Sequence, residues 1–199
     1  MALLATTELE AVNMMLAAIQ EAPVSTITDE TIEDAAIALS MLRQVTKEIL
    51  GRGWHFNTDY DYVLSVDGNL NIPIPTTASH VDPERSTSKD YVRRGDFLYD
   101  REEQTFDFAA GTTVKCRIIW MFDYEDLPQT FRTYIAMRAA NRFVQQTLGD
   151  EGNVQFSKEE VGMARAEAVA DDVRRSDSNM LTGSYTNYNV IRRRRQWRV

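Results

Sequence analysis

The chain has 199 residues, of which 43% are hydrophobic and 26% charged, the composition of an ordinary soluble protein with ample length for a core. Its formal net charge of -8 and its pI near 4.9 argue against a sequence-reading DNA-binding domain, which normally carries a basic face. A single cysteine, no apolar run near the roughly 20 residues of a membrane helix, and no signal peptide together indicate assembly in a reducing cytoplasm, without disulfides or membrane insertion.

Two helices are expected in the first 53 residues. Thr7 and Glu10 have the spacing of a capping box, and apolar residues then recur at helical spacing up to Ala22-Pro23. A second helix is expected to begin near Thr28-Asp29, where acidic residues suit the positive end of the helix dipole, and to continue to Gly51-Arg-Gly53. The apolar residues of this second helix keep the helical period: Ile32, Ala36, Leu39, Leu42, Val45 and Ile49. The sequence therefore predicts an antiparallel helical pair.

The middle of the chain has the pattern of β-strands. Tyr62–Val66 and Asn69–Ile72 flank Asp67-Gly68, a dipeptide that readily takes the positive φ angles of a type I′ turn. A β-hairpin is therefore predicted here. Pro73 and Pro75 are expected to end its second strand or to hold it at a sheet edge, because proline cannot donate a hydrogen bond to a neighbouring strand.

Further strands are expected before residue 122. The polar run Thr76–Lys89 is predicted to be a long surface loop. Tyr91–Tyr99 and Gln104–Phe108 indicate a second hairpin around Asp100–Glu103. Thr113–Trp120 alternates at first and then becomes continuously apolar, as a strand entering a core would. The sequence thus predicts a small antiparallel sheet or sandwich inserted between helices.

The longest helix, Gln129–Leu148, is expected to be the central member of the fold. Asp126 and Pro128 suit its start and Gly149 its end. Its apolar positions form two adjacent stripes: Phe131, Ile135 and Ala139, and beside them Tyr134, Met137, Val144 and Leu148. Such a wide apolar face predicts a helix contacted on two sides.

This helix carries three arginines and no acid: Arg132, Arg138 and Arg142. In an acidic chain, these cations are expected to attract carboxylates, either from neighbouring helices or from another subunit. A last helix should begin at the capping-box pattern Ser157–Glu160 and run to about Met180. Its acidic residues Glu159, Glu160 and Glu167 are candidates to pair with the arginines.

These elements together predict an α+β fold. Residues 1–53 and 123–181 are expected to form a helical bundle, and residues 54–122 an inserted antiparallel β domain. Residues 182–199 have no periodic pattern and many turn formers, so they are expected to be an extended tail.

The tail is a separate electrostatic feature. It contains five arginines and no acid, whereas the rest of the chain has 17 basic and 30 acidic residues and a net charge of -13. Three interpretations remain open: a solvated charged tail, a nucleic-acid contact, or docking on an acidic protein surface. Aromatic residues among the arginines favour docking, because Tyr, Trp and Arg are enriched at interface hot spots. The candidate docking residues are Tyr185, Tyr188, Arg192, Arg193, Arg194, Arg195, Trp197 and Arg198.

Catalytic and cofactor-binding patterns are few. No HExxH, CxxC, GxSxG, P-loop or dinucleotide-binding glycine pattern occurs, so no metal or cofactor is expected. His55 is predicted to pack among aromatic residues, His80 to face solvent, and Cys116 to be a small core residue rather than a nucleophile. Two acidic pairs, Asp59/Asp61 and Glu102/Glu103, have the residue types of a glycosidase, but neighbouring acids in a turn are more often simply solvated.

Three stretches of the chain carry a resemblance to a known family: Met1-Ala-Leu-Leu-Ala-Thr-Thr-Glu-Leu-Glu-Ala-Val-Asn13, Gly51-Arg-Gly-Trp-His-Phe-Asn57 and Asp126-Leu-Pro-Gln-Thr-Phe-Arg-Thr-Tyr-Ile135. With the closing Asn189-Val-Ile-Arg-Arg-Arg-Arg195, their order and spacing resemble the tail tubular A proteins of T7-like podophages over essentially the whole chain. None of these stretches is a catalytic motif, so the specificity of the resemblance lies in their joint order.

The resemblance implies a structural, non-enzymatic virion protein. It implies a head-to-tail adaptor, a dodecameric ring that joins the portal protein to the tubular nozzle protein, tail tubular protein B, with tail fibre protein attached around it. Genomic DNA would pass through the ring during ejection without sequence-specific binding, and assembly would take place in the host cytoplasm. In such a ring, the arginines of the central helix become candidate ring-interface residues and the tail a candidate portal contact. The alternative is a tail-associated glycan hydrolase.

Overall fold

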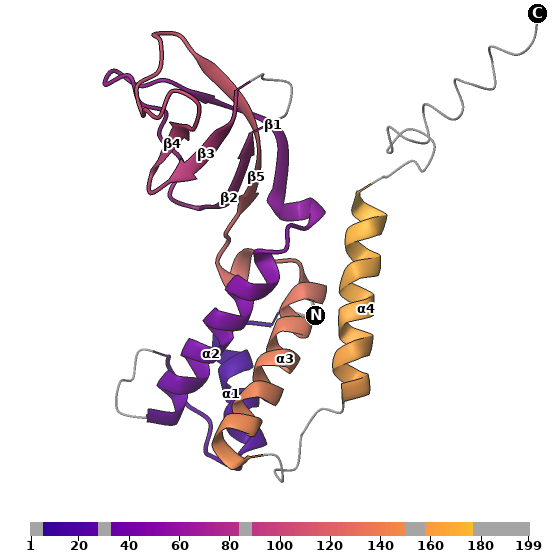
Figure 1. Cartoon of the computed structure of the whole chain (residues 1–199). Helices are drawn as coiled ribbons and strands as arrows, with labels where there is room; N and C mark the ends of the chain where they lie inside the picture. Colours follow the sequence, from indigo (N-terminus) through magenta and orange to yellow (C-terminus); the bar gives the residue numbers. More distant parts are fainter. Residues whose placement is uncertain (1–5, 28–32, 84–88, 150–157, 177–199) are drawn as a thin grey trace, which may run out of the picture.

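The computed structural model of the chain describes residues 6–27, 33–83, 89–149 and 158–176, and it confirms an α+β fold (Figure 1). Four helices form a bundle, and a unit of five strands, β1–β5, stands on one end of it. The helices are α1 (Glu8–Ala18), α2 (Glu33–Leu50), α3 (Gln129–Leu148) and α4 (Lys158–Arg175). The strands lie between α2 and α3 in the sequence, as the predicted insertion requires. The expected extended tail, residues 182–199, lies outside the described residues.

Helix α3 is the central member of the bundle, because it contacts α1, α2 and α4. Its bounds are those predicted, with Pro128 at the N-cap and Gly149 ending the helix at a φ of 76°. The first apolar stripe is buried along its length, and Ala136, Ala140 and Phe143 extend it. Leu148, expected in the second stripe, is instead 49% exposed, because it lies at the last turn beyond the reach of the neighbouring helices.

The first two helices also follow the sequence pattern, although α1 ends at Ala18, before the predicted end at Ala22-Pro23. The Thr7 hydroxyl accepts a hydrogen bond from the Glu10 N–H at 3.1 Å, and the Glu10 carboxylate accepts one from the Thr7 N–H at 2.9 Å. This reciprocal pair is the predicted capping box. The predicted start of the second helix, at Thr28-Asp29, lies outside the described residues, and its end at Leu50 precedes Gly51 as expected.

Strand β5 (Thr113–Trp120) is the centre of the larger sheet, which has the order β1-β5-β2 and is antiparallel throughout. Strand β1 (Thr58–Ser65) places Val63 opposite Lys115, and β2 (Ala78–Pro83) places Val81 opposite Ile118. A second sheet consists of β3 (Tyr91–Arg94) and β4 (Phe97–Asp100). The two sheets enclose a core separate from that of the bundle, formed by Leu64, Ile72, Ile74, Ala78, Val81, Leu98, Phe108, Val114, Cys116 and Ile118.

The hairpin predicted from Tyr62 to Ile72 is wrong. A turn does form after Asp67, whose carboxylate accepts hydrogen bonds from the N–H groups of Asn69 and Asn71, both at 2.9 Å. However, positive φ is adopted by Leu70 and not by Gly68, so a type I′ turn does not form. The chain crosses to the other sheet, where the Ile72 carbonyl accepts a hydrogen bond from Leu98, and burial of Ile72 in the second core outweighs the local turn preference.

Two other expectations about this region are also corrected. The predicted surface loop Thr76–Lys89 contains strand β2, whose buried residues Ala78 and Val81 cover β5. The second hairpin turns earlier than predicted, at Gly95-Asp96 rather than at residues 100–103. Gly95 has a φ of 63°, which glycine tolerates at the first central position of a two-residue turn. The stretch Gln104–Phe108 returns only as an isolated bridge, Asp100 to Thr105.

The bundle and the β unit are joined at Asn57, a fully buried residue of the short helix η1 (His55–Asn57). Its amide nitrogen donates to the carbonyl of Leu50 at 3.0 Å and to that of Trp120 at 2.8 Å. Its amide oxygen accepts from the Trp54 N–H at 2.7 Å. One side chain thus links the end of α2, the loop that leaves it, and the end of β5.

Tight packing surrounds this junction. Gly53 has a φ of 74°, and a Cβ atom there would lie 2.8 Å from Cδ1 of Ile119, so only glycine fits. The rings of Trp54 and Phe56 contact Phe131 of α3, with centroid distances of 4.8 and 4.7 Å. The predicted aromatic cluster after the second helix therefore anchors the β unit on the bundle.

Candidate assembly surfaces

The arginines of α3 are engaged within the subunit. Arg132 donates from Nε to the Leu127 carbonyl at 2.7 Å and from Nη1 to the Thr6 carbonyl at 3.3 Å. These bonds hold the start of α3 against the segment before α1. The phenol of Tyr124 donates to the Arg132 carbonyl at 3.0 Å, and burial of that phenol raises the pKa of Tyr124 above its ordinary value.

Arg138 and Arg142 both pair with Glu48 of α2. Arg142 lies 2.8 Å from the Glu48 carboxylate, and Arg138 donates to the same carboxylate and to the Tyr134 hydroxyl. The two arginines are four residues apart and therefore share one helix face. The partner of both is therefore Glu48 of α2 and not Glu159, Glu160 or Glu167, the candidates that the sequence offered on the last helix.

Helix α4 is held against the bundle by a narrow contact. Ala168 is its one buried residue among those described. The Thr130 hydroxyl donates to Asp171 at 3.1 Å, and the backbone N–H of His55 donates to the carboxylate of Asp172 at 3.0 and 3.1 Å. The hydrogen bond from Arg175 lowers the pKa of Asp171 below its ordinary value, and the Thr130 hydroxyl acts in the same direction. Neither aspartate was singled out from the sequence.

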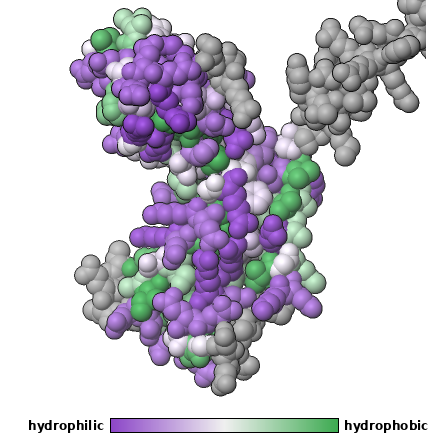
Figure 2. Space-filling view, viewed as in Figure 1, coloured by the Kyte–Doolittle hydropathy of each residue, from purple (hydrophilic) through white to green (hydrophobic). Residues whose placement is uncertain are grey.

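The outer face of α4 is apolar although nothing in the described chain covers it. Figure 2 shows hydrophobic residues along this helix, and Met163 and Val173 are 69% and 57% exposed. A shallow groove follows this face and is lined by Gly162, Arg165, Ala166, Val169, Ala170, Val173 and Arg174. We refer to these seven residues together with Met163 as the α4 outer face. An amphipathic helix normally presents one apolar stripe to its own core; α4 has a second stripe on the opposite side.

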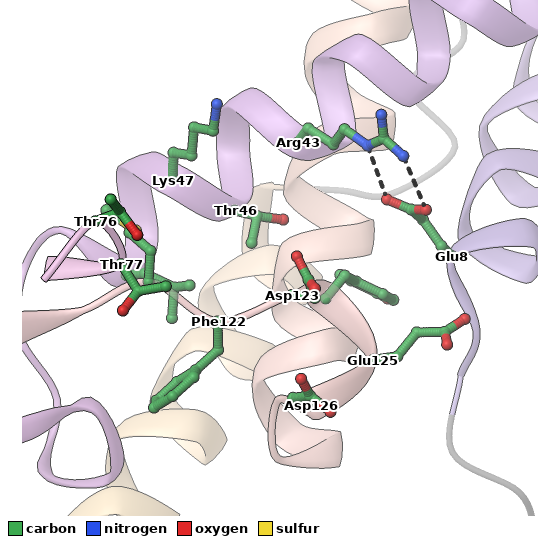
Figure 3. Close-up of a pocket in the computed structure, with 13 residues that line it drawn as sticks. Glu8, Arg43, Thr46, Lys47, Thr76, Thr77, Phe122, Asp123, Glu125 and Asp126 are labelled. Carbon is green, nitrogen blue, oxygen red and sulfur yellow. Dashed lines mark hydrogen bonds and ion pairs between the residues drawn. The ribbon is translucent and has the colours of Figure 1, made fainter. Parts of the chain in front are cut away.

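A larger groove, of about 730 Å³, lies where the bundle meets the β unit (Figure 3). We call it the junction groove; it is lined by Glu8, Arg43, Thr46, Lys47, Leu50, Thr76, Thr77, Met121, Phe122, Asp123, Tyr124, Glu125 and Asp126. Arg43 is bound by Glu8 at 3.1 Å, and this hydrogen bond is the main reason that the pKa of Arg43 is raised, with Asp123 adding to it. Phe122 is 39% exposed at this groove.

The residues considered for catalysis have structural surroundings. His55 is exposed rather than packed, because its neighbours Trp54 and Phe56 fill the aromatic cluster, and His80 is exposed on β2 as expected. Cys116 is fully buried on β5, which confirms its expected place in the core. No group of three or more potential metal ligands occurs within the described part of the chain.

Three of the four acids considered for a glycosidase are likewise used locally. Asp59 accepts a hydrogen bond from the Trp120 indole at 2.8 Å, and Asp61 lies 3.4 Å from Lys115 across the β1–β5 pair. Glu103 pairs with Lys89 at 2.5 Å. None of these residues lines the junction groove or the α4 outer face. Searching the same described residues, we find no helix long and apolar enough to cross a membrane.

The residues predicted to dock on the portal lie outside the described part of the chain: Tyr185, Tyr188, Arg192, Arg193, Arg194, Arg195, Trp197 and Arg198. Their role therefore rests on the sequence. The described part of the structure offers two surfaces for assembly, the α4 outer face and the junction groove.

Comparison with known proteins agrees with the resemblance found in the sequence. Residues 9–178 match the model of a family described as tail tubular protein. Tail tubular protein A of Klebsiella phage KP34 is 31% identical to this chain over 147 residues, which cover 73% of this chain and 76% of that protein. The family match spans both the helical bundle and the β unit.

Proposed function

This chain belongs to the tail tubular protein family and is a structural protein of a phage tail, and we propose that it forms the head-to-tail adaptor of its virion. In this proposal, twelve copies form a ring between the portal protein and the tubular nozzle protein. Tail fibre protein attaches around the ring, and the genome passes through it during packaging and ejection. The copies assemble in the cytoplasm of the host bacterium.

The observation that carries this proposal is the family match across both units of a two-part subunit. The bundle and the β unit have separate cores and are stacked end to end (Figure 1). An adaptor must present different surfaces to the proteins above and below it. A subunit with a helical end and a β end supplies two such surfaces without requiring either to change its fold.

The charge of the chain also suits a channel for DNA. Outside the five arginines near its end, the chain has 17 basic and 30 acidic residues. A ring with an acidic body repels phosphate, whereas a basic lumen would bind the sliding duplex and slow it. We therefore expect DNA to pass without sequence-specific contacts.

We propose that the arginine-rich segment attaches the ring to the portal. Each arginine can form charge-assisted and often bidentate hydrogen bonds with carboxylates, and Trp197 adds an aromatic anchor. Because exposed ion pairs contribute only about 0–1 kcal/mol each, attachment requires several contacts per subunit, repeated around the ring. The arginines of α3 remain proposed ring contacts, and Arg142, with 40% of its side chain exposed, is more accessible than Arg138, with 23%.

The proposal is tested by mixing the purified chain with its portal and measuring co-sedimentation. We expect the full chain to be mainly monomeric alone and to form a ring on the portal. A chain ending at Asn189 should keep its melting temperature but fail to remain attached. Replacing Arg192–Arg195 and Arg198 by lysine should weaken attachment less than deletion, because charge is kept while the planar guanidinium is lost.

Two results would contradict the proposal in different ways. A stable ring formed without portal would overturn the expected order of assembly. A truncated chain that still binds portals and gives infectious particles would show that the arginine-rich segment is not the attachment, while leaving the adaptor ring in place.

A further inference from the structure

The α4 outer face and the junction groove are chemically complementary. The outer face is an apolar stripe whose groove is edged by the guanidinium groups of Arg165 and Arg174. The junction groove is lined by the partly exposed ring of Phe122 and by the carboxylates of Asp123, Glu125 and Asp126 (Figure 3). The α4 outer face, apolar with basic edges, thus matches the junction groove, which combines an apolar ring with acidic residues.

The balance of charge in the junction groove remains negative after internal pairing. Arg43 is paired with Glu8. Lys47 is the one other basic residue among those that line the groove. The carboxylates of Glu125 and Asp126 form no salt bridge with any residue that the structure describes. They are therefore available to a guanidinium group from outside the subunit, which a carboxylate can bind through two parallel hydrogen bonds.

We propose that the α4 outer face of one copy docks in the junction groove of the next copy, and that this contact closes the ring. The inference rests on the proposed adaptor ring and names the surfaces that build it. In this contact Val169 and Val173 lie against Phe122, while Arg165 and Arg174 meet Glu125 and Asp126.

The two surfaces lie on different sides of the subunit. Each copy in the ring therefore presents its α4 outer face to one neighbour and its junction groove to the other. The junction groove is lined by α1, α2 and the segments next to β2 and η2 (Tyr124–Asp126), whereas α4 lies against α3 on another side of the bundle. The two surfaces share no residue. Contacts between two different patches of the same chain are heterologous, and they generate closed rings when the rotation between copies closes. A second copy is therefore the occupant, because both halves of the contact are present on one chain.

The size of the contact also agrees with assembly that depends on the portal. One face of an 18-residue helix is a small interface, and a stable protein pair usually buries about 1,200–2,000 Å² in total. Copies that meet only through this face would dissociate when free. When the portal holds neighbouring copies side by side, the same contact becomes effectively intramolecular and is strengthened by the high local concentration.

Cysteine cross-linking tests the contact directly. Cys116 is the only cysteine and is fully buried, so the unmodified chain serves as the background control. Two single variants, Val169→Cys and Phe122→Cys, are mixed on portals and treated with a flexible bismaleimide. We expect a cross-link between the two different variants and none when either variant is used alone, because each contact joins one residue of each kind. Leu148→Cys, exposed at the end of α3, is the matched negative control.

Charge reversal provides a second test that does not depend on cross-linking. Arg165→Glu with Arg174→Glu should reduce the number of copies bound per portal by about tenfold or more, since like charges would then face each other. Adding Glu125→Lys and Asp126→Lys to the same chain should restore assembly to within about threefold, because the charges are exchanged rather than removed. Melting temperatures of the variants establish that each one folds.

The outcomes separate this inference from the proposed function. A ring that forms on the portal without the cross-link, and that survives charge reversal, overturns the proposed contact but leaves the adaptor. If Arg142→Glu alone abolishes that ring, the interface belongs to α3. If the unmodified chain forms no multi-copy complex on the portal, both the adaptor and the contact are rejected.

Discussion

At the scale of single residues, Asn57 joins the bundle to the β unit, although no sequence pattern marks it for this role. It lies in an aromatic stretch where nothing in the spacing distinguishes it from a loop residue. The structure shows that its three hydrogen bonds are made in a fully buried site. Buried polar groups of this kind specify geometry, because each lost bond leaves groups that water cannot reach.

We expect Asn57→Ala to lower the free energy of unfolding by about 2–4 kcal/mol, since three buried hydrogen bonds are lost and each contributes about 0.5–1.5 kcal/mol. Urea denaturation followed by circular dichroism measures this change. Asn69→Ala is the matched control, because Asn69 is exposed and its removal should cost less than about 0.5 kcal/mol. Equal stability of the two variants would show that Asn57 does not hold the junction.

Asp100 has a comparable role within the β unit. It is nearly fully buried at the end of β4, and its carboxylate accepts hydrogen bonds from the N–H groups of Glu102 at 2.9 Å and Glu103 at 3.1 Å and lies 3.4 Å from Lys89. Burial alone would raise the pKa of Asp100, but these hydrogen bonds stabilise the charged form and bring the pKa below its ordinary value. Residues 100–103, which were expected to form a hairpin loop, are therefore held in a turn by the Asp100 carboxylate.

A pH dependence follows from the lowered pKa of Asp100. Because the pKa is lower in the folded state than in the unfolded state, the stabilisation is present above the unfolded pKa of about 4 and is lost as the pH falls through the folded pKa. The stability difference between the unmodified chain and Asp100→Asn should thus be largest above pH about 4 and should shrink at lower pH. Thermal unfolding at several pH values measures it, with the exposed Asp107→Asn as control. A difference that is independent of pH would contradict the assignment.

At the scale of elements, helices and the core strand were predictable and strand pairing was not. The bounds of α3 and β5 agree with the sequence because local signals fix them: proline and glycine at the ends of α3, and a continuous apolar run in β5. The hairpins failed because a strand's partner is chosen by burial over the whole sheet. Ile72 and Ile74 gain more by entering the second core than by pairing back with β1.

We expect the bundle (residues 1–53 and 123–181) and the β unit (residues 54–122) to open as separate units in hydrogen exchange. Ile118→Ala should accelerate exchange in β1 and β5, with a local loss of about 2–5 kcal/mol, and leave α3 protected. Ile135→Ala is the reciprocal variant, since Ile135 is buried in the bundle. Simultaneous acceleration in both units by either substitution would contradict independent opening.

At the scale of the whole molecule, the sequence predicted an assembly protein but not the surfaces of assembly. The three α3 arginines were evident as an unbalanced charge, yet the carboxylate that Arg138 and Arg142 share, Glu48, lies on α2, 90 residues before Arg138. Only the packed structure shows that α4 uses one side for α3 and that no other described part of the chain covers its opposite side.

The hydrogen bonds of Asn57 hold the two ends of the β unit close together. Its amide nitrogen lies 3.0 Å from the Leu50 carbonyl and 2.8 Å from the Trp120 carbonyl, so these two oxygens are at most 5.8 Å apart. The chain therefore leaves the helices and returns to them at nearly the same point. A segment with adjacent ends can be exchanged for another without opening the scaffold that carries it. We expect recombination between phages to exchange the β unit as a cassette, which changes the surface at that end of the subunit while the helical scaffold is inherited intact.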